Sequence, residues 1–413
     1  MASLKHLIFF TLSLGSACAE VYYNTIVDRY FSPYIGAEDI LSAHRGLEYT
    51  QDLIYSPPAK PPRGFWIGME RFSELFFLWD PVNVTASTTQ HEVFGHGYRI
   101  RSLNHEGAVV KSYTIDVPFP YGDGGGATYF KYKERQVTTF ENLATASGGV
   151  EATAILANRL KLQWLQKGSI DGRESTLYND SEHDISEYIW FTSGKAGEDD
   201  GDIGHYVHNL NKTYPHSHLS IRSLKRQALV NLLDPFTYYA IYAWWRYVIA
   251  GKKTSMPMIP MWSYRYLPGM RIGLTPFGPE YYLDNFLVKD KKPIYFYLRG
   301  GHFSKQTYFG FGVEHAYLWN LESLPWGLRL DCWYQPHHAF RDLHYSLKKL
   351  HTKGHFTSQP HNRFLGLALT VIGHKKLWSH GAVYFQIGGK TIGYLEGETL
   401  QPSLIARIGF TFW

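Results

Sequence analysis

The strongest constraint on the fold is a run of alternating residues that begins near residue 271 and lasts to residue 413. Large apolar side chains recur at every second position, and glycine, small or polar residues stand between them. In the last segment, Leu404, Ile408 and Phe410 share one frame, whereas Arg407 and Gly409 share the other. This two-residue period predicts β-strands, because successive side chains of a strand point to opposite faces of the sheet.

The alternating region predicts a C-terminal antiparallel β-barrel of about eight strands. We expect these strands at residues 268–277, 279–288, 293–304, 306–318, 326–335, 362–373, 380–393 and 404–413. Their length suits tilted membrane crossings, and a glycine-rich second face suits a crowded barrel interior. The aromatic end, Phe410 to Trp413, resembles the closing strand of outer-membrane barrels of Gram-negative bacteria. A soluble β-domain is the alternative, since it also buries an apolar face.

A second feature is the run from His91 to Gly97 (HEVFGHG), which contains the residue types of a metal-dependent catalytic site. His91 and His96 offer two neutral nitrogen ligands, and Glu92 offers a carboxylate beside the first. Zinc hydrolases use two such ligands and a general base. The familiar helical motif is HExxH, so this chain carries one extra residue between the two His.

The extra residue poses a geometric problem. Positions five apart diverge by roughly 140° on an ideal α-helix, which is too far for a shared metal ion. A single π-bulge would bring both rings to one side, and Gly95 and Gly97 would permit it or end the helix at that point. We expect the motif on a helix that begins at Asp80 and runs to about Leu103.

A catalytic zinc site needs a third protein ligand, for which Glu151 is the best candidate. A capping box of Thr138 and Glu141 predicts a helix start, and Glu151 lies on the apolar stripe of that region. Gly148-Gly149 allow another backbone to approach closely. A buried Arg that pairs with Glu151, or a cap role for Glu151, is the alternative. The weaker ligand candidates are His105, Asp116 and Glu141.

HEVFGHG resembles the HExxGHG motif of the dipeptidyl-peptidase III type of metallopeptidase, a gluzincin-like group. The resemblance covers seven residues and one spacing. It implies that His91 and His96 bind Zn²⁺ and that Glu92 is the base. By position, it implies Glu151 as the third ligand. The family's second motif begins with paired acids, whereas this chain has Gly-Gly-Val-Glu-Ala there.

The first 19 residues read as a cleaved signal peptide. Lys5 precedes the apolar run 7–14, and Ala17-Cys18-Ala19 gives a cleavage site. That run is too short to span a membrane. Lipidation at Cys18 is the alternative. After cleavage only Cys332 remains, so no internal disulfide is expected.

The middle of the chain carries weaker signals. Residues 198–202 are acidic and either hold calcium or solvate a loop, with Asp202 capping a helix over 203–210. Residues 223–250 predict a helix broken near Asp234-Pro235. Residues 108–117 predict a strand, and the glycine-rich 122–129 lack the lysine of a phosphate loop. The histidines of this region, read as ordinary surface, are His205, His208, His216 and His218.

Together these observations predict an α+β chain with a signal peptide (1–19), a mainly helical zincin-like domain (20–265) and a transmembrane β-barrel (266–413). We expect a zinc-dependent hydrolase, most simply a metallopeptidase, in the outer membrane of a Gram-negative bacterium. Its partners would be a peptide or protein substrate and outer-membrane lipid. A net charge of +5 without a long basic run predicts no nucleic-acid binding. The alternatives are a non-enzymatic outer-membrane protein, or a hydrolase of esters, lipids or cell-wall amides.

Overall fold

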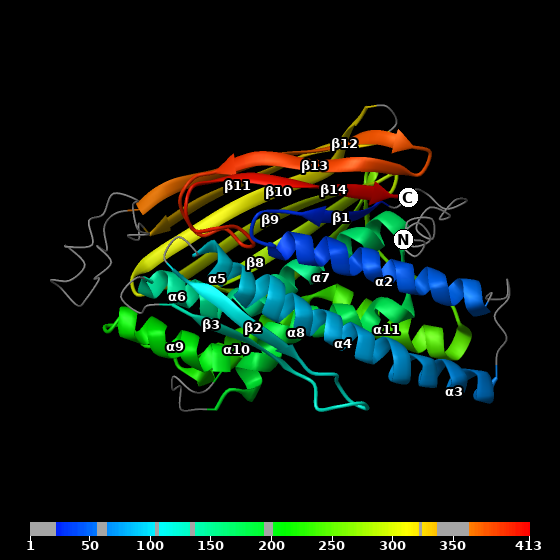
Figure 1. Cartoon of the computed structure of the whole chain (residues 1–413), viewed down its shortest axis with the longest axis horizontal. Coiled ribbons are helices and arrows are strands. Elements are labelled where there is room, and N and C mark those ends of the chain that lie inside the picture. The colour runs from blue at the N-terminus through cyan, green and yellow to red at the C-terminus, as the bar shows by residue number, and fades with distance from the viewer. Residues whose placement is uncertain are drawn as a thin grey trace.

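The computed structural model describes residues 22–55, 64–103, 107–132, 137–193, 201–321, 324–336 and 363–413. The expected signal peptide, Cys18, His105 and the acidic residues 198–200 lie outside these ranges. Within them the chain is α+β, with a mainly helical N-terminal part and a C-terminal antiparallel sheet. The sheet lies along one side of the helices (Figure 1).

One long helical segment carries the histidine motif. It consists of α3 (Phe65–Glu74), the π-helix η1 (Leu75–Trp79), α4 (Asp80–Thr89), the π-helix η2 (Gln90–His96) and α5 (Gly97–Ser102). The expected start at Asp80 is wrong, because Trp79 already has helical backbone angles. The π-turn of η1 directly precedes Pro81, whose ring cannot donate a hydrogen bond and needs extra room within a helix.

Further helices pack around this segment. They are α2 (Pro33–Tyr55), α6 (Thr139–Ala146), α7 (Gly148–Lys167), the turn η4 (Gly172–Glu174), α8 (Ser175–Phe191), α9 (Gly201–Thr213), α10 (Ile221–Ala228), the 3-10 helix η5 (Leu229–Leu233) and α11 (Pro235–Ala250). The predicted capping box of Thr138 and Glu141 begins α6 and is confirmed. Among the described residues, no helix has the length and apolar character required to cross a membrane.

All eight expected strands are present, with bounds shifted by a few residues. They are β7 (Tyr264–Thr275), β8 (Gly278–Lys289), β9 (Lys292–Phe303), β10 (Gln306–Leu321), β11 (Leu324–Pro336), β12 (Arg363–Trp378), β13 (Gly381–Lys390) and β14 (Ser403–Phe412). Each pairs with its neighbour in sequence, and β1 (Tyr23–Val27) and β6 (Ile259–Met261) extend the sheet at its two ends. In the described residues the sheet is therefore open, with β1 and β6 as edges, and β14 pairs with β1 rather than with β7.

The edge strand β1 is covered by α2. Asp39 on α2 accepts a hydrogen bond from the backbone N–H of Ile26, at 2.8 Å. Ser42 on α2 donates to the carbonyl of Asn24, at 2.7 Å. Side chains of α2 thus satisfy backbone groups that an exposed strand edge would leave open to another chain.

The two faces of the sheet differ sharply. On β12, Leu367 and Leu369 are exposed, whereas Ala368 and Thr370, in the other frame, are buried. The face toward the helices carries buried ion pairs, which include Arg299 with Glu280. Two apolar clusters fill the space between the helices and this inner face. The sheet therefore exposes apolar side chains and buries charged ones, the reverse of a usual soluble sheet.

Four short strands lie outside the large sheet. β2 (Val109–Ile115) and β3 (Gly126–Lys131) form an antiparallel pair beside η2, so the strand expected over 108–117 is confirmed. β4 (Ser169–Ile170) pairs with β5 (Thr254–Ser255). The β2–β3 pair lies beside the histidine motif, with β3 against η2 and β2 against α5.

Candidate metal centre

The extra residue of the motif is absorbed by a π-helix, as predicted. In η2, the hydrogen-bonding pattern spans five residues, so positions five apart lie above one another. His91 and His96 therefore point the same way, and their Nε2 atoms are 3.1 Å apart. Both imidazoles are almost fully buried.

A carboxylate from a distant helix completes a group of three possible ligands. Asp202, in the first turn of α9, places its Oδ2 atom 3.1 Å from His91 Nε2 and 2.9 Å from His96 Nε2. Ligand atoms that share one zinc ion at about 2.0–2.2 Å stand roughly 3–3.5 Å apart. Among the described residues, this is one of two groups in which three ligand atoms come close enough for a metal ion.

The remaining ring nitrogens have partners that fix the tautomer. Nδ1 of His91 lies 2.8 Å from the carboxylate of Asp184, and Nδ1 of His96 lies 2.7 Å from the carbonyl of Thr145. Thr153 donates a hydrogen bond to the same Asp184 carboxylate, at 2.7 Å. Because both Nδ1 atoms face acceptors, they carry the ring hydrogens, as in metal-ligating histidines.

This tautomer leaves three acceptor atoms facing one another. When the rings are neutral, the Nε2 lone pairs of His91 and His96 and the Oδ2 atom of Asp202 have no hydrogen between them. Such an arrangement is repulsive unless a cation lies among the three atoms. The donor set of two imidazoles and one carboxylate fits Zn²⁺, and a fourth position would remain for water.

The local field also favours positive charge at this place. Burial alone lowers the pKa of both imidazoles, but neighbouring carboxylates outweigh it. Asp184 holds the pKa of His91 well above its ordinary value, and Asp202 raises that of His96. Burial raises the pKa of Asp202, but the imidazoles of His96 and His91 more than reverse this and hold it well below its usual range.

Glycines allow the π-helix η2 and helix α7 to cross closely. A Cβ atom on Gly149 would lie 2.1 Å from His91 Nε2, and one on Gly95 would lie 2.6 Å from the carbonyl oxygen of Gly148. The expectation that Gly148-Gly149 admit another backbone is thus confirmed. The crossing presses the two elements together at the point where the ligand atoms meet.

Glu151 does not join the group, which corrects the prediction that it is the third ligand. Its carboxylate forms a buried ion pair with Arg99, with hydrogen bonds of 2.6 and 3.1 Å, and also accepts from the backbone N–H of Gly397. The alternative considered from the sequence, a buried Arg as its partner, is what the structure contains. Its oxygens are thus engaged with Arg99 and Gly397, and it does not belong to the group of three possible ligands.

Glu92 is buried beside the two histidines and is held by strand β3. Thr128 donates a hydrogen bond to its carboxylate at 2.6 Å, and the same hydroxyl contacts its backbone carbonyl at 2.9 Å. A Cβ atom on Gly126 would lie 2.7 Å from Glu92 Cγ, so the strand backbone passes directly against this side chain.

Tyr188 on α8 forms one wall of the centre. Its ring stacks on that of His91, with centroids 4.8 Å apart and an angle of 15° between the planes. Asp184 lies one helical turn earlier on the same face of α8. The side chain of Asp202 is 28% exposed, compared with 3% for His91, so solvent reaches the group from the side of α9.

The other candidates from the sequence lie apart from this group. Glu141 serves its capping box, and Asp116 follows the exposed end of β2. The four histidines between 205 and 218 are also absent from it. The second possible ligand group consists of His44, Glu48 and Glu174. It is fully buried, and its members already bond to Asn83, Arg45, Trp164 and Lys167.

Sequence reasoning missed Asp184 and Tyr188, and it gave Asp202 the role of a helix cap. An acidic residue and an aromatic residue one turn apart on α8 were the available signal.

Comparison of the chain with protein-family models, with curated proteins and with solved structures finds no match.

Proposed function

We propose that the chain is a zinc-dependent hydrolase whose metal ligands are His91, His96 and Asp202. The observation that carries this proposal is the convergence of two Nε2 atoms and one carboxylate oxygen, all within 3.1 Å of one another. The partners of the Nδ1 atoms support it, because Asp184 and the Thr145 carbonyl orient the rings as ligands.

Zinc at such a site supplies Lewis acidity and lowers the pKa of a water molecule toward about 7. Glu92 is the residue that takes a proton from the attacking water and returns it to the leaving group. Thr128 keeps one oxygen of Glu92 in a fixed position through its 2.6 Å hydrogen bond. Asp184 holds the His91 ring and offsets part of the positive charge.

A peptide is the substrate class that we propose. β3 passes beside Glu92, and its residues Tyr129 and Phe130 expose large aromatic surfaces. An extended chain can add to a strand by backbone hydrogen bonds, with side chains held at alternate positions. Ester or cell-wall amide substrates would need the same base and the same ligands.

The decisive experiment replaces the base and leaves the ligands intact. Glu92→Gln should lower the turnover of a peptide library, read by mass spectrometry, by about 10²–10⁴-fold. Zinc, measured on the purified chain, should stay near one ion per molecule. Glu70→Gln, at an exposed position on α3, is the matched control. Full activity of Glu92→Gln, or a wild-type chain that binds no zinc, would contradict the proposal and favour a non-enzymatic role.

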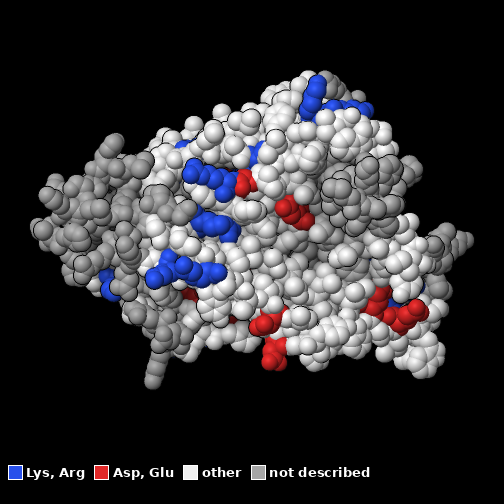
Figure 2. All heavy atoms as spheres, in the orientation of Figure 1, with Lys and Arg blue, Asp and Glu red and all other residues white. Residues whose placement is uncertain are grey.

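We also propose that the sheet is the wall of a barrel-like body in the outer membrane, reached through the expected signal peptide. In support, the outer frame of the sheet exposes large apolar side chains on several strands. They include Leu298, Phe309, Phe311, Leu365, Leu367, Leu369, Ile387, Leu404, Ile408 and Phe410. In the view of Figure 2, charged side chains are sparse among the described residues and leave broad uncharged areas.

Helical segments outside the sheet also expose apolar side chains. The exposed positions of α11 recur at helical spacing and are apolar or aromatic, namely Tyr238, Ile241, Tyr242, Trp245 and Ile249. Those of α3 and η1 include Phe65, Trp66, Met69, Phe77 and Leu78. α2 packs on the edge strand β1, and α11 packs on α3 and β7. We propose that these helices complete the perimeter that the open sheet begins, with tyrosine and tryptophan at the lipid interface.

A further inference from the structure

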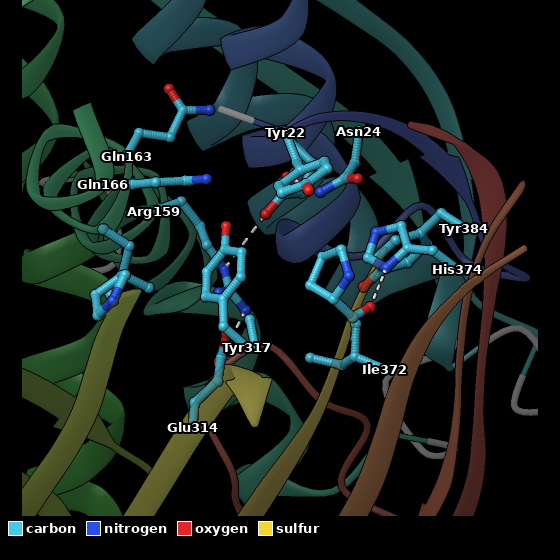
Figure 3. Close-up of a pocket in the computed structure, with 15 residues that line it drawn as sticks. Tyr22, Asn24, Arg159, Gln163, Gln166, Glu314, Tyr317, Ile372, His374 and Tyr384 are labelled. Atoms are coloured by element: carbon cyan, nitrogen blue, oxygen red, sulfur yellow. Dashed lines mark hydrogen bonds and ion pairs between the residues drawn. The ribbon is translucent and has the colours of Figure 1, made fainter. Parts of the chain in front are cut away.

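A cavity of about 80 Å³ lies between the inner face of the sheet and helices α2 and α7, away from the metal centre (Figure 3). Strands β10 and β12 form one wall, and the N-terminal segment with Tyr22 and Asn24 forms another. The cavity contains buried groups whose bonding is incomplete.

His374 on β12 is one of the residues that line this cavity, and one of its ring nitrogens is unpartnered. Its Nδ1 atom lies 2.7 Å from the carbonyl oxygen of Pro325 and therefore carries the ring hydrogen. Its Nε2 atom is buried and has no hydrogen-bond partner, although the residue is only 6% exposed. A buried acceptor without a donor costs free energy, so this position favours a ligand that donates a hydrogen bond.

The charges that line the cavity do not balance. Arg159 pairs with Glu314 through two hydrogen bonds, one of 3.1 Å. Glu38 lies farther from the same guanidinium, at 3.7 Å, and its other partner is the neutral amide of Asn24, at 2.9 Å. Burial raises the pKa of Glu38, and Arg159 offsets this only in part. Arg329 and Arg407 also act on Glu314 from outside the lining of the cavity. Glu38 is therefore the carboxylate that could balance the charge of a bound cation.

Aromatic rings surround the unfilled space. The Tyr22 ring centroid lies 6.1 Å from that of Tyr317 and 6.0 Å from that of His374, and Tyr384 lies 5.4 Å from His374 on the other side. The faces of such rings attract organic cations. A volume of this size accepts roughly six non-hydrogen atoms. No three-ligand metal group occurs here among the described residues, so a metal ion fits less well than an organic cation.

We propose that this cavity binds a primary alkylammonium ion of about four to six non-hydrogen atoms. An ammonium N–H donates to His374 Nε2, the charge is balanced by Glu38, and the alkyl chain lies against Tyr22, Tyr317 and Tyr384. The site is independent of the metal ligands, so its occupancy does not depend on zinc.

The test is calorimetric titration of the full-length chain in detergent with n-butylammonium chloride, with n-butanol as the uncharged ligand of matched size. We expect saturable binding of one n-butylammonium per chain, at least 10-fold tighter than that of n-butanol. Equal binding of both ligands, or binding of neither, would overturn the proposal and leave a cavity filled by water.

Variants localise the binding. Glu38→Gln and His374→Leu should each weaken n-butylammonium binding at least 10-fold. His302→Leu, at an exposed position on β9, should leave it unchanged. Unaltered far-ultraviolet circular dichroism and Tm establish that each variant is folded. If a variant fails to fold, the comparison of the two ligands on the wild-type chain still decides. Folded Glu38→Gln that binds as tightly as wild type would refute the assignment.

Discussion

Among single residues, the choice of carboxylate decides whether the centre exists. Asp202 directs an oxygen at both imidazoles, whereas Glu151 forms an ion pair with Arg99. Replacement of these two acids is therefore expected to have opposite effects on zinc binding and on stability. Asp202 is partly exposed, and its imidazole partners can release a proton when its charge is removed, whereas the buried guanidinium that pairs with Glu151 stays charged.

We expect Asp202→Ala to lose stoichiometric zinc, and its free energy of unfolding, measured without metal, should fall by less than that of Glu151→Gln. Glu151→Gln should keep zinc in its folded fraction but lose about 3–5 kcal/mol of stability, because Arg99 stays buried without its partner. Metal analysis and urea denaturation measure the two effects. Zinc loss in Glu151→Gln together with zinc retention in Asp202→Ala would reverse the assignment of the third ligand.

The two imidazoles could be predicted as neighbours because they belong to one helical segment, where spacing alone fixes geometry. Asp202 could not, because it lies 106 residues from His96 and reaches it only through the packing of α9. A first-turn aspartate is also a common helix cap, so its sequence context favoured the simpler role. The apolar stripe did place Glu151 inward correctly, but it carries no information about which buried partner a carboxylate meets.

Among the elements, the crossing of η2 and α7 is the feature that shapes the centre. Gly149→Ala places a methyl group 2.1 Å from the position of His91 Nε2, so the ring must move. We expect this variant to bind zinc at least 10-fold more weakly, as measured by competition with a chelator. Gly46→Ala is the matched control, because this α2 position has open space around it and alanine favours helix by up to about 1 kcal/mol.

Wild-type zinc affinity in folded Gly149→Ala would mean that the ligands are not positioned by this crossing.

Most helices and strands could be predicted from the sequence. Alternation located β7 to β14, and the five-residue spacing of the histidines predicted the π-turn. β1 was missed because five residues near the N-terminus show too short a period, and its pairing with β14 joins the two ends of the chain.

In the whole molecule, polarity is inverted across the sheet. Charged pairs such as Arg407 with Glu398 lie on the buried face, and leucine, isoleucine and phenylalanine lie on the exposed face. Water favours apolar side chains on the buried face, because exposed apolar area costs about 25 cal/mol per Å². Lipid favours apolar side chains on the exposed face, as observed here. The alternation alone could not decide between these environments, because it gives the period but not which frame faces inward.

Leu369→Arg tests the environment of the outer face. Leu369 is 44% exposed, so water would accept the arginine with little change in stability. In a bilayer, arginine near the midplane costs about 2–4 kcal/mol. We therefore expect Leu369→Arg to lower the fraction of chains that insert into liposomes, measured by flotation. Val109→Arg, at an equally exposed position on β2 of the helical part, should insert like wild type. Two results together would contradict this expectation: the wild-type chain stays monomeric in buffer without lipid or detergent, and Leu369→Arg floats with liposomes to the same extent as wild type. They would show that this face meets water and that the sheet belongs to a soluble fold.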